Sequence, residues 1–206
     1  NTIQDKGRNM SNDLKFKISH KVTEDNSSNF TIKPLDRGYG ITIGNSLRRA
    51  LLTAVPGAAI TNVKIEGAHH EFSTIDGVTE DLADIIMNLK GVRFHLFESK
   101  VEPIFLKVKG PNAFTAADIQ AVSDDFTILN PDYHITDIAK GTTLEVELRL
   151  GIGKGYKSSE ENKLNNSPVG MIPIDSIFNP VTKVSFNVSP LPGAKEDTEM
   201  LSLNVT

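Results

Sequence analysis

Residues 38–54 read GYGITIGNSLRRALLTA, and this stretch decides how the chain is interpreted. Three glycines, Gly38, Gly40 and Gly44, lead into an apolar segment with helical spacing, so we expect a helix over about 44–55. A glycine-rich turn that opens a helix often binds a phosphate or a dinucleotide. The alternative is that the glycines only shape the turn, so that the helix can hold something else.

The residues around the glycines argue against a dinucleotide site. Glu66 ends the next predicted strand, near the place of a ribose-binding carboxylate, which favours such a site. The strand at 30–35, however, alternates polar and apolar residues, whereas the first strand of a dinucleotide fold is buried on both faces and continuously apolar. Asp36 and Arg37 also stand where small apolar residues normally lead into the turn. We therefore favour a structural role for the glycines.

Other short motifs give no convincing active site. GIGKG at 151–155 resembles half a phosphate-binding loop, but Tyr156 follows and no helix is predicted after it. His69, His70 and Glu71 are adjacent, and neighbours in a strand point to opposite faces, so they cannot easily share one metal ion. We find no serine in a nucleophile-elbow motif. We expect no catalytic residue, no cofactor site and no metal site in this chain.

The composition is typical of a folded globular protein. The chain has 206 residues, of which 38% are hydrophobic, and no apolar run approaches the roughly 20 residues that cross a bilayer. The absence of cysteine and of a signal-peptide pattern suits a reducing cytoplasm. A net charge of −4 does not favour direct nucleic-acid binding as the main role. Because the sequence begins with Asn1, we expect the first residues of the gene product to be missing from it.

The pattern along the chain predicts a mixed α+β protein. A second helix is expected over 79–91, capped by Thr79 or Asp76 and followed by Gly91 in the position after the helix. Its apolar stripe consists of Val78, Leu82, Ile85, Ile86 and Leu89. The remaining segments are expected as strands at 14–18, 30–35, 59–67 and several between 101 and 150, with further strands near the C-terminus and loops at 22–28, 151–167 and 189–199.

The first helix has apolar residues on more than one side. At 100° per residue, one stripe around Ile43 consists of Leu47, Ala50, Leu51 and Ala54. Leu52 lies nearly opposite, which indicates either a second buried surface, as in a helix shared with another subunit, or a helix sunk in a larger core. Arg48 and Arg49 project about 100° apart, so they cannot clamp a single ligand together.

Two long segments resemble a known family. The first, at 34–92, is PLDRGYGITIGNSLRRALLTAVPGAAITNVKIEGAHHEFSTIDGVTEDLADIIMNLKGV, and the second, at 167–188, is SPVGMIPIDSIFNPVTKVSFNV. Both resemble the alpha subunit of bacterial DNA-directed RNA polymerase in its N-terminal assembly region, and the similarity runs over roughly 13–188. The ordered series of R-G-x-G-x-T-x-G-N-x-L-R-R, H-E-F-S-T, V-x-E-D and N-L-K-G is far more specific than one short motif.

The resemblance implies an α+β scaffold of two subdomains. A discontinuous α/β dimerisation subdomain is expected over 13–56 and 179–206, with a mostly-β subdomain inserted at 57–178 and a flexible N-terminus at 1–12. Two copies of a family member form a dimer, which recruits the beta and then the beta-prime subunit for DNA-templated transcription. Catalysis and its magnesium ions belong to those large subunits, so the chain itself is expected to hold no cofactor. DNA is met only through the assembled enzyme, in the cytoplasm and nucleoid, without a membrane.

The resemblance also assigns candidate contact residues. Arg48 and Arg49 match the family's arginine pair, and Arg49 is our first choice for a contact to beta, because a guanidinium can bind a carboxylate bidentately. Further matches to positions at or near subunit contacts are Arg37, Gly38, Asn45 and Lys90. Each has a local alternative: a solvated turn residue for Arg37, a helix cap for Asn45 and a helix-dipole partner for Lys90.

The dimer helix is expected to use one set of apolar residues, within the subunit and across the dimer. The set is Leu47, Ala50, Leu51, Leu52 and Ala54. In this interpretation the glycines orient the helix and bind no phosphate. A dinucleotide-binding lobe and a structural protein unrelated to transcription are the alternatives.

The sequence departs from the family pattern near its end. SPLPGAKEDTEM replaces the usual polar stretch after the strand that ends near 188, and the chain ends at Thr206. Family members continue into a long helix that completes the dimer interface, then a linker and a DNA-binding domain. The sequence is therefore either a piece of a longer protein or an unusual member, and dimerisation without that helix is an open question.

Overall fold

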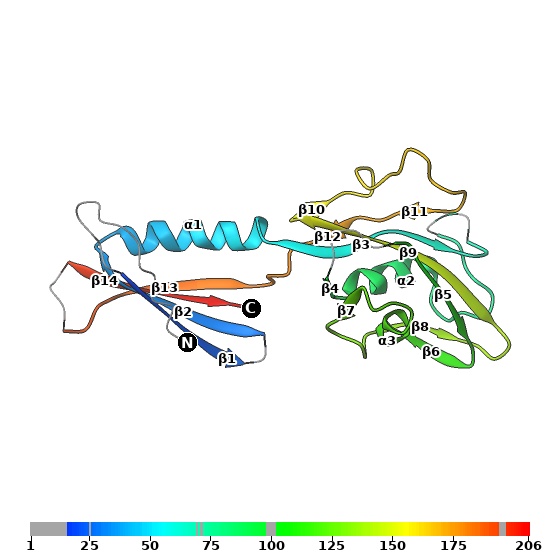
Figure 1. The fold of residues 1–206 in the computed structure, drawn as a ribbon, viewed down its shortest axis with the longest axis horizontal. Coiled ribbons are helices and arrows are strands. Elements are labelled where there is room, and N and C mark those ends of the chain that lie inside the picture. The colour runs from blue at the N-terminus through cyan, green and yellow to red at the C-terminus, as the bar shows by residue number, and fades with distance from the viewer. Residues whose placement is uncertain (1–15, 25, 69, 71, 98–101, 194–196) are drawn as a thin grey trace. The chain divides into compact units, whose positions relative to one another are not determined.

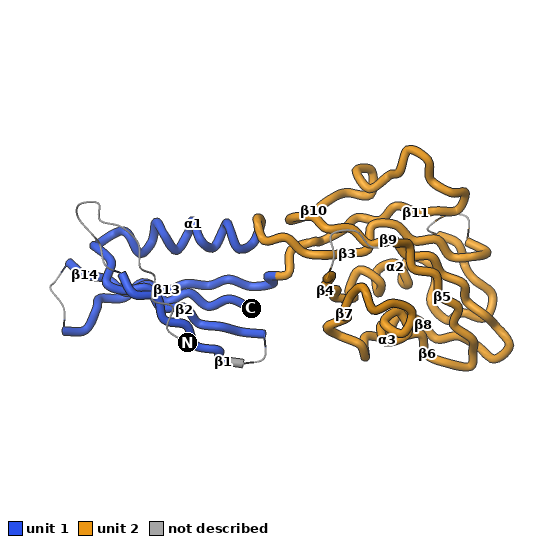
Figure 2. The backbone as a smooth tube through the Cα atoms, viewed as in Figure 1, with its two compact units in different colours: residues 1–52, 181–206 blue, residues 53–180 orange. Residues whose placement is uncertain are grey.

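The protein combines helices and strands in two compact units, so the α+β class expected from the sequence is confirmed (Figures 1 and 2). Unit 1 consists of residues 1–52 and 181–206, and unit 2 of residues 53–180. The sequence placed these boundaries at 56/57 and 178/179. The computed structural model describes residues 16–24, 26–68, 70, 72–97, 102–193 and 197–206. The N-terminal segment 1–12, expected to be flexible, lies outside these residues.

In its described residues, unit 1 is one helix on one antiparallel sheet. The sheet has four strands in the order β1-β2-β14-β13. Their bounds, with that of the helix, are β1 Lys17–Glu24, β2 Ser27–Asp36, α1 Tyr39–Thr53, β13 Val184–Pro190 and β14 Thr198–Val205. Strands from both ends of the chain thus share one sheet, which makes the unit discontinuous in sequence.

The first hairpin is tighter than the sequence indicated. We expected a loop over 22–28, but β1 and β2 extend into it and Val22 pairs with Ser28. Asn26 adopts a positive φ of 64°, a conformation that asparagine tolerates better than most residues. One residue in this conformation lets the chain reverse within a short turn.

Unit 2 is built around a larger sheet of six strands. Five follow the order β5-β9-β3-β4-β7, and β11 pairs with β3. Two small two-stranded sheets pair β6 with β8 and β10 with β12. The bounds are β3 Pro56–Ile65, α2 Leu82–Gly91, β4 Phe94–Leu96, β5 Ile104–Lys109, β6 Asn112–Thr115, α3 Ala116–Gln120, β7 Phe126–Ile128, β8 His134–Ile138, β9 Thr143–Lys154, β10 Tyr156–Lys157, β11 Ile172–Pro173 and β12 Ser176–Ile177.

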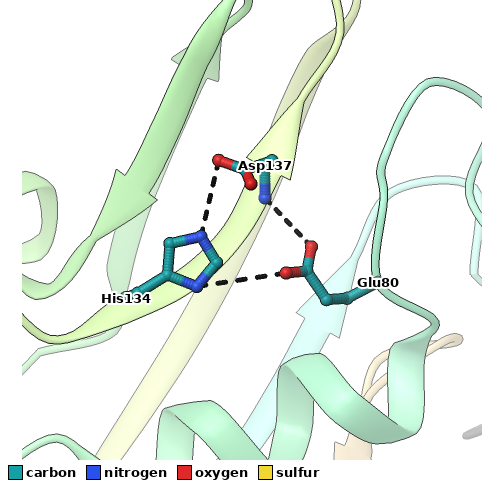
Figure 3. A group of neighbouring side chains, drawn as sticks. All are labelled: Glu80, His134 and Asp137. Carbon is teal, nitrogen blue, oxygen red and sulfur yellow. Dashed lines mark hydrogen bonds and ion pairs between the residues drawn. The ribbon is translucent and has the colours of Figure 1, made fainter.

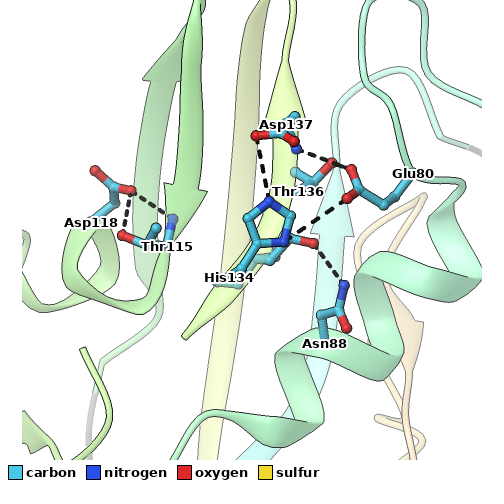
Figure 4. Close-up of polar contacts among 8 residues, drawn as sticks. Glu80, Asn88, Thr115, Asp118, His134, Thr136 and Asp137 are labelled. Carbon is cyan, nitrogen blue, oxygen red and sulfur yellow. Dashed lines mark hydrogen bonds and ion pairs between the residues drawn. The ribbon is translucent and has the colours of Figure 1, made fainter. Parts of the chain in front are cut away.

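The stripe predicted for α2 is confirmed for four of its five residues; the fifth, Val78, precedes the helix, is only partly buried and forms a β-bridge with Ile138. The predicted ends of the helix are wrong. The buried residues of the helix are Leu82, Ile85, Ile86 and Leu89. The cap is Asp81, whose side chain accepts a hydrogen bond of 2.9 Å from the backbone N–H of Asp84, and not Thr79 or Asp76. Gly91 is the last helical residue rather than the residue after the cap. Asn88 ties α2 to the small sheet by donating to the carbonyl of Ile135 at 2.8 Å (Figure 4).

Two further segments differ from expectation. The predicted loop at 151–167 is partly strand, because β9 continues to Lys154 and β10 follows. The helix α3 was not predicted, since five residues are too short to show a helical period. Its capping box is local: the carboxylate of Asp118 accepts from the backbone N–H and the hydroxyl of Thr115 (Figure 4). Among the described residues, we find no helix with both the length and the apolar character needed to cross a bilayer.

Candidate functional site

The helix α1 begins at Tyr39, five residues before the predicted start, so the predicted role of the glycines is partly wrong. Only Gly38, with a φ of 88°, lies in the turn. Gly40 and Gly44 lie inside the helix and are its buried residues. A side-chain carbon on Gly40 would lie 2.7 Å from Val188 Cγ1, and one on Gly44 would lie 2.5 Å from Phe186 Cδ2.

These two glycines therefore allow the helix backbone to lie close against β13. Such contact costs helix propensity, about 1 kcal/mol per glycine relative to alanine, which close packing has to offset. A buried position between a helix and a sheet leaves no phosphate cradle. Two of the three glycines on which the dinucleotide hypothesis depends are therefore not in the turn. Gly40 and Gly44 have a structural role, but they serve helix–sheet packing rather than the turn.

The sheet face under α1 carries aligned apolar rows. In an antiparallel sheet, directly paired residues point to the same face. Val188 pairs with Leu201, Leu201 with Ile32, and Ile32 with Ile18, so one row crosses all four strands. The next row is Phe186, Leu203, Phe30 and His20. Both rows begin on β13, where the glycines of α1 make their contacts.

Burial falls along these rows toward β1. Leu201 is fully buried and Ile32 almost so, but Ile18 is 61% exposed. Phe16 and Val22, beside the same edge, are also more than half exposed. The sequence predicted a half-buried strand at 14–18, but β1 runs over Lys17–Glu24, residues 16–23 are all exposed, and 14 and 15 lie outside the described residues. The exposure fits a helix α1 that packs over the β13 side of the face. Unit 1 thus presents an apolar surface, defined here as Phe16, Ile18 and Val22.

The apolar residues predicted for the dimer helix are only partly buried in the structure. Leu47, with Ile43, packs against the unit-1 core, and Leu51 and Leu52 are half-buried. Ala50 is exposed, and Ala54 is exposed and lies beyond the end of α1. The later part of the predicted stripe is therefore mixed, with half-buried leucines and exposed alanines.

The polar contact candidates of α1 face solvent. Asn45, Arg48 and Arg49 are all exposed. Asn45 is not a helix cap, because α1 begins six residues earlier, at Tyr39. The role of the three side chains in a subunit contact stays a prediction.

The turn before α1 is joined to the start of β14. The backbone N–H of Arg37 donates to the carbonyl of Asp197 at 3.0 Å, and the two side chains approach to 3.9 Å. Gly40 N–H donates to Glu199 Oε2 at 3.3 Å, which satisfies a free donor at the helix start. The Arg37–Asp197 pair is largely exposed, and such pairs typically contribute at most about 1 kcal/mol. A contact role for Arg37 and Gly38 stays a prediction.

Lys90 forms an ion pair within unit 2. Its ammonium donates to Asp175 Oδ1, and the two side chains are about one-quarter and one-third exposed. The pair connects the last turn of α2 with the segment between β11 and β12. Lys90 therefore has a partner in its own chain, and its proposed contact with another subunit remains a prediction.

The earlier motif candidates give no catalytic constellation. Residues 151–154 of GIGKG run as β9 rather than as a phosphate loop. In the His-His-Glu run, His69 and Glu71 lie outside the described residues, while His70 is exposed. The structure does place three other polar side chains close together, those of Glu80, His134 and Asp137 in unit 2 (Figure 3). Sequence reasoning missed this group because Glu80 precedes α2 and the other two lie on β8.

Comparison with known proteins identifies the family. The family model described as "RNA polymerase Rpb3/RpoA insert domain" matches residues 63–179, more than half of the chain. The DNA-directed RNA polymerase subunit alpha of Salinibacter ruber is 50% identical over 182 residues, which is 88% of this chain and 56% of that protein. The subunit alpha of Limosilactobacillus reuteri is 46% identical over 190 residues, 90% of this chain and 60% of that protein.

The subunit alpha of Chloroherpeton thalassium is 46% identical over 177 residues, 85% of this chain and 54% of that protein. The chain therefore spans between 54% and 60% of the length of these three relatives. The matches cover both the α1 segment and the whole of the larger sheet region. On these grounds the chain belongs to the alpha-subunit family of DNA-directed RNA polymerase.

Proposed function

We propose that this chain is a non-catalytic assembly scaffold of DNA-directed RNA polymerase. Two copies associate through unit 1, and the dimer recruits the beta and then the beta-prime subunit. Catalytic residues and magnesium belong to those partners, DNA is reached only through the assembled cytoplasmic enzyme, and no membrane is involved. The observation that carries the proposal is the apolar surface of unit 1, Phe16, Ile18 and Val22, on a member of this family.

A second copy of the chain fits this surface better than an unrelated partner. Most homo-oligomers are two-fold dimers, in which the same patch on each copy contacts the other and must therefore complement itself. The exposed residues are aliphatic and aromatic, and apolar surfaces of this kind are self-complementary without charge pairing. The later part of the α1 stripe, with exposed Ala50 and half-buried Leu51, offers small and aliphatic side chains for the same association.

The arginine pair of α1 supplies a different kind of contact. Arg48 and Arg49 are exposed and project about 100° apart, so they can meet two separate groups on a large partner. A guanidinium binds a carboxylate through two parallel hydrogen bonds, which sets orientation as well as affinity. We propose Arg49 as the first contact to beta, and Asn45, Arg48, Arg37, Gly38 and Lys90 as further positions at or near subunit contacts.

Replacing Arg49 with alanine is expected to weaken capture of the beta subunit by at least about tenfold, equivalent to 1.4 kcal/mol. Loss of one partner from a hydrogen-bonded charge pair at an interface typically costs about 2–5 kcal/mol, which exceeds that threshold. Surface substitutions usually change folding stability by less than about 0.5 kcal/mol, so the variant should stay folded. The dissociation constant is measured by surface plasmon resonance with immobilised beta.

The matched control is Lys21→Ala, which removes an exposed positive charge from β1 of the same unit. It should bind beta as the unchanged chain does. If Arg49→Ala also binds with unchanged affinity, Arg49 does not contact beta. If both variants lose affinity for beta equally, the loss reflects the reduced positive charge of the chain rather than a specific contact of Arg49.

A further inference from the structure

Unit 2 holds a group of three possible metal ligands that the assembly role does not use. Glu80 lies just before α2, while His134 and Asp137 lie on β8, and their side chains point toward one another (Figure 3). One ligand atom from each residue lies within 4.8 Å of the other two. His134 Nδ1 is 3.9 Å from Glu80 Oε1, and His134 Nε2 is 3.4 Å from Asp137 Oδ1.

Glu80 is held in place by groups outside its possible ligand contacts. Its Oε2 accepts a hydrogen bond of 2.5 Å from the hydroxyl of Thr136 and one of 3.0 Å from the backbone N–H of Asp137 (Figure 4). Thr136 is fully buried, so this support is rigid. The arrangement leaves Oε1 directed at the imidazole of His134.

The same contacts act on the carboxyl group of Glu80. Burial raises its pKa, but the hydrogen bonds from Thr136 and from the Asp137 backbone outweigh burial, and the nearby His134 adds to them, so the pKa of Glu80 lies below its ordinary value. Without a cation, two carboxylates share one imidazole between them.

We propose that Glu80, His134 and Asp137 bind a divalent transition-metal ion, with zinc as the best match. Two carboxylate oxygens and one imidazole nitrogen form a mixed oxygen–nitrogen set, which suits zinc better than the oxygen-only preference of magnesium and calcium. Zinc bonds of about 2.0–2.2 Å in a tetrahedron place ligand atoms roughly 3.4 Å apart, and water takes the fourth position.

The side chains have to rearrange to reach that geometry, because Glu80 Oε1 faces Nδ1 of His134 whereas Asp137 Oδ1 faces Nε2. The ion takes one ring nitrogen, so the imidazole has to rotate, and the side chains of His134 and Asp137 are 46% and 60% exposed. Glu80, at 22%, remains as the fixed ligand. A bound ion would join the segment before α2 to β8, a function independent of the dimerisation and recruitment proposed above.

The test is titration of zinc chloride into the 206-residue chain after chelator treatment, followed by calorimetry. One saturable site is expected, and a hundredfold excess of magnesium should not displace the zinc. Removing an outer-shell partner of a metal ligand typically costs about 10- to 100-fold in affinity. His134→Ala removes a direct ligand, so its loss of zinc affinity should be larger. Asp137→Asn should weaken binding as well, and both positions are exposed enough to tolerate the change.

The control is His70→Ala, which removes an exposed histidine from the His-His-Glu run at 69–71. It should bind zinc with unchanged affinity, and zinc should raise the unfolding midpoint of this control but not that of His134→Ala. The proposal is overturned by the absence of saturable zinc binding. It is equally overturned if His134→Ala keeps the affinity of the unchanged chain, or if His70→Ala is the variant that loses it.

Discussion

Replacing Ile18 with aspartate is expected to convert a dimer of this chain into folded monomers. Ile18 lies on the edge strand β1, is 61% exposed and stands in the apolar row that ends on the uncovered part of the unit-1 sheet. An aspartate at the centre of a two-fold interface would bury two carboxylates, one from each copy, without positive partners. Leaving a buried charge without a partner costs about 3–5 kcal/mol, which corresponds to a hundredfold or greater loss of affinity between the two copies.

The measurement is sedimentation velocity over a concentration series of both proteins. The matched control is Ser19→Asp, which introduces the same charge one residue further along β1, on the opposite face of the sheet. This control should dimerise as the unchanged chain does. A dimer that survives Ile18→Asp would place the interface elsewhere, whereas an unchanged chain that is monomeric at every concentration would contradict dimerisation through unit 1 alone.

Replacing Leu148 with alanine is expected to lower the unfolding free energy of unit 2 by about 2–5 kcal/mol. Leu148 is fully buried in β9 and lies between Ile104 of β5 and Val63 of β3, both of which are buried on the same face. Removing its three outer carbons leaves a cavity in a sheet whose neighbours are fixed by backbone hydrogen bonds, so the space cannot easily close.

The stability is measured by urea unfolding followed by circular dichroism. Phe105→Ala is the control, because it removes an even larger side chain from the adjacent β5, but one that is 65% exposed. That variant should lose much less stability than Leu148→Ala. Comparable losses for the two variants would contradict the assignment of the buried and exposed faces of this sheet.

Segments whose apolar residues recur with one clear period are predicted well from the sequence. The α2 stripe from Leu82 to Leu89 is buried as the 3.6-residue period requires. The sequence also alternates through Leu144, Val146, Leu148 and Leu150; the first three form the buried face of β9, and Leu150 is partly buried. In both cases a single element supplies the whole pattern, so no knowledge of its neighbours is needed.

Features that depend on a neighbouring element could not be predicted in this way. Gly40 and Gly44 look like turn residues until Val188 and Phe186 are seen against them. The alternation of apolar and polar residues in β1 shows that Ile18 lies on the apolar face of the sheet. It does not show that α1 leaves Ile18 uncovered. Glu80 and His134 are far apart in sequence, and they meet because the segment before α2 pairs with β8, through the Val78–Ile138 bridge and the hydrogen bond from Thr79 N–H to the Asp137 carbonyl.

The central claim is that this chain scaffolds polymerase assembly, and the most direct test is its stoichiometry with the beta subunit. The two proteins are co-expressed, purified together and analysed by size-exclusion chromatography with multi-angle light scattering. The account predicts one complex with two copies of this chain and one beta subunit. A folded chain that forms no complex with beta, or that binds it only as a single copy, would contradict the account.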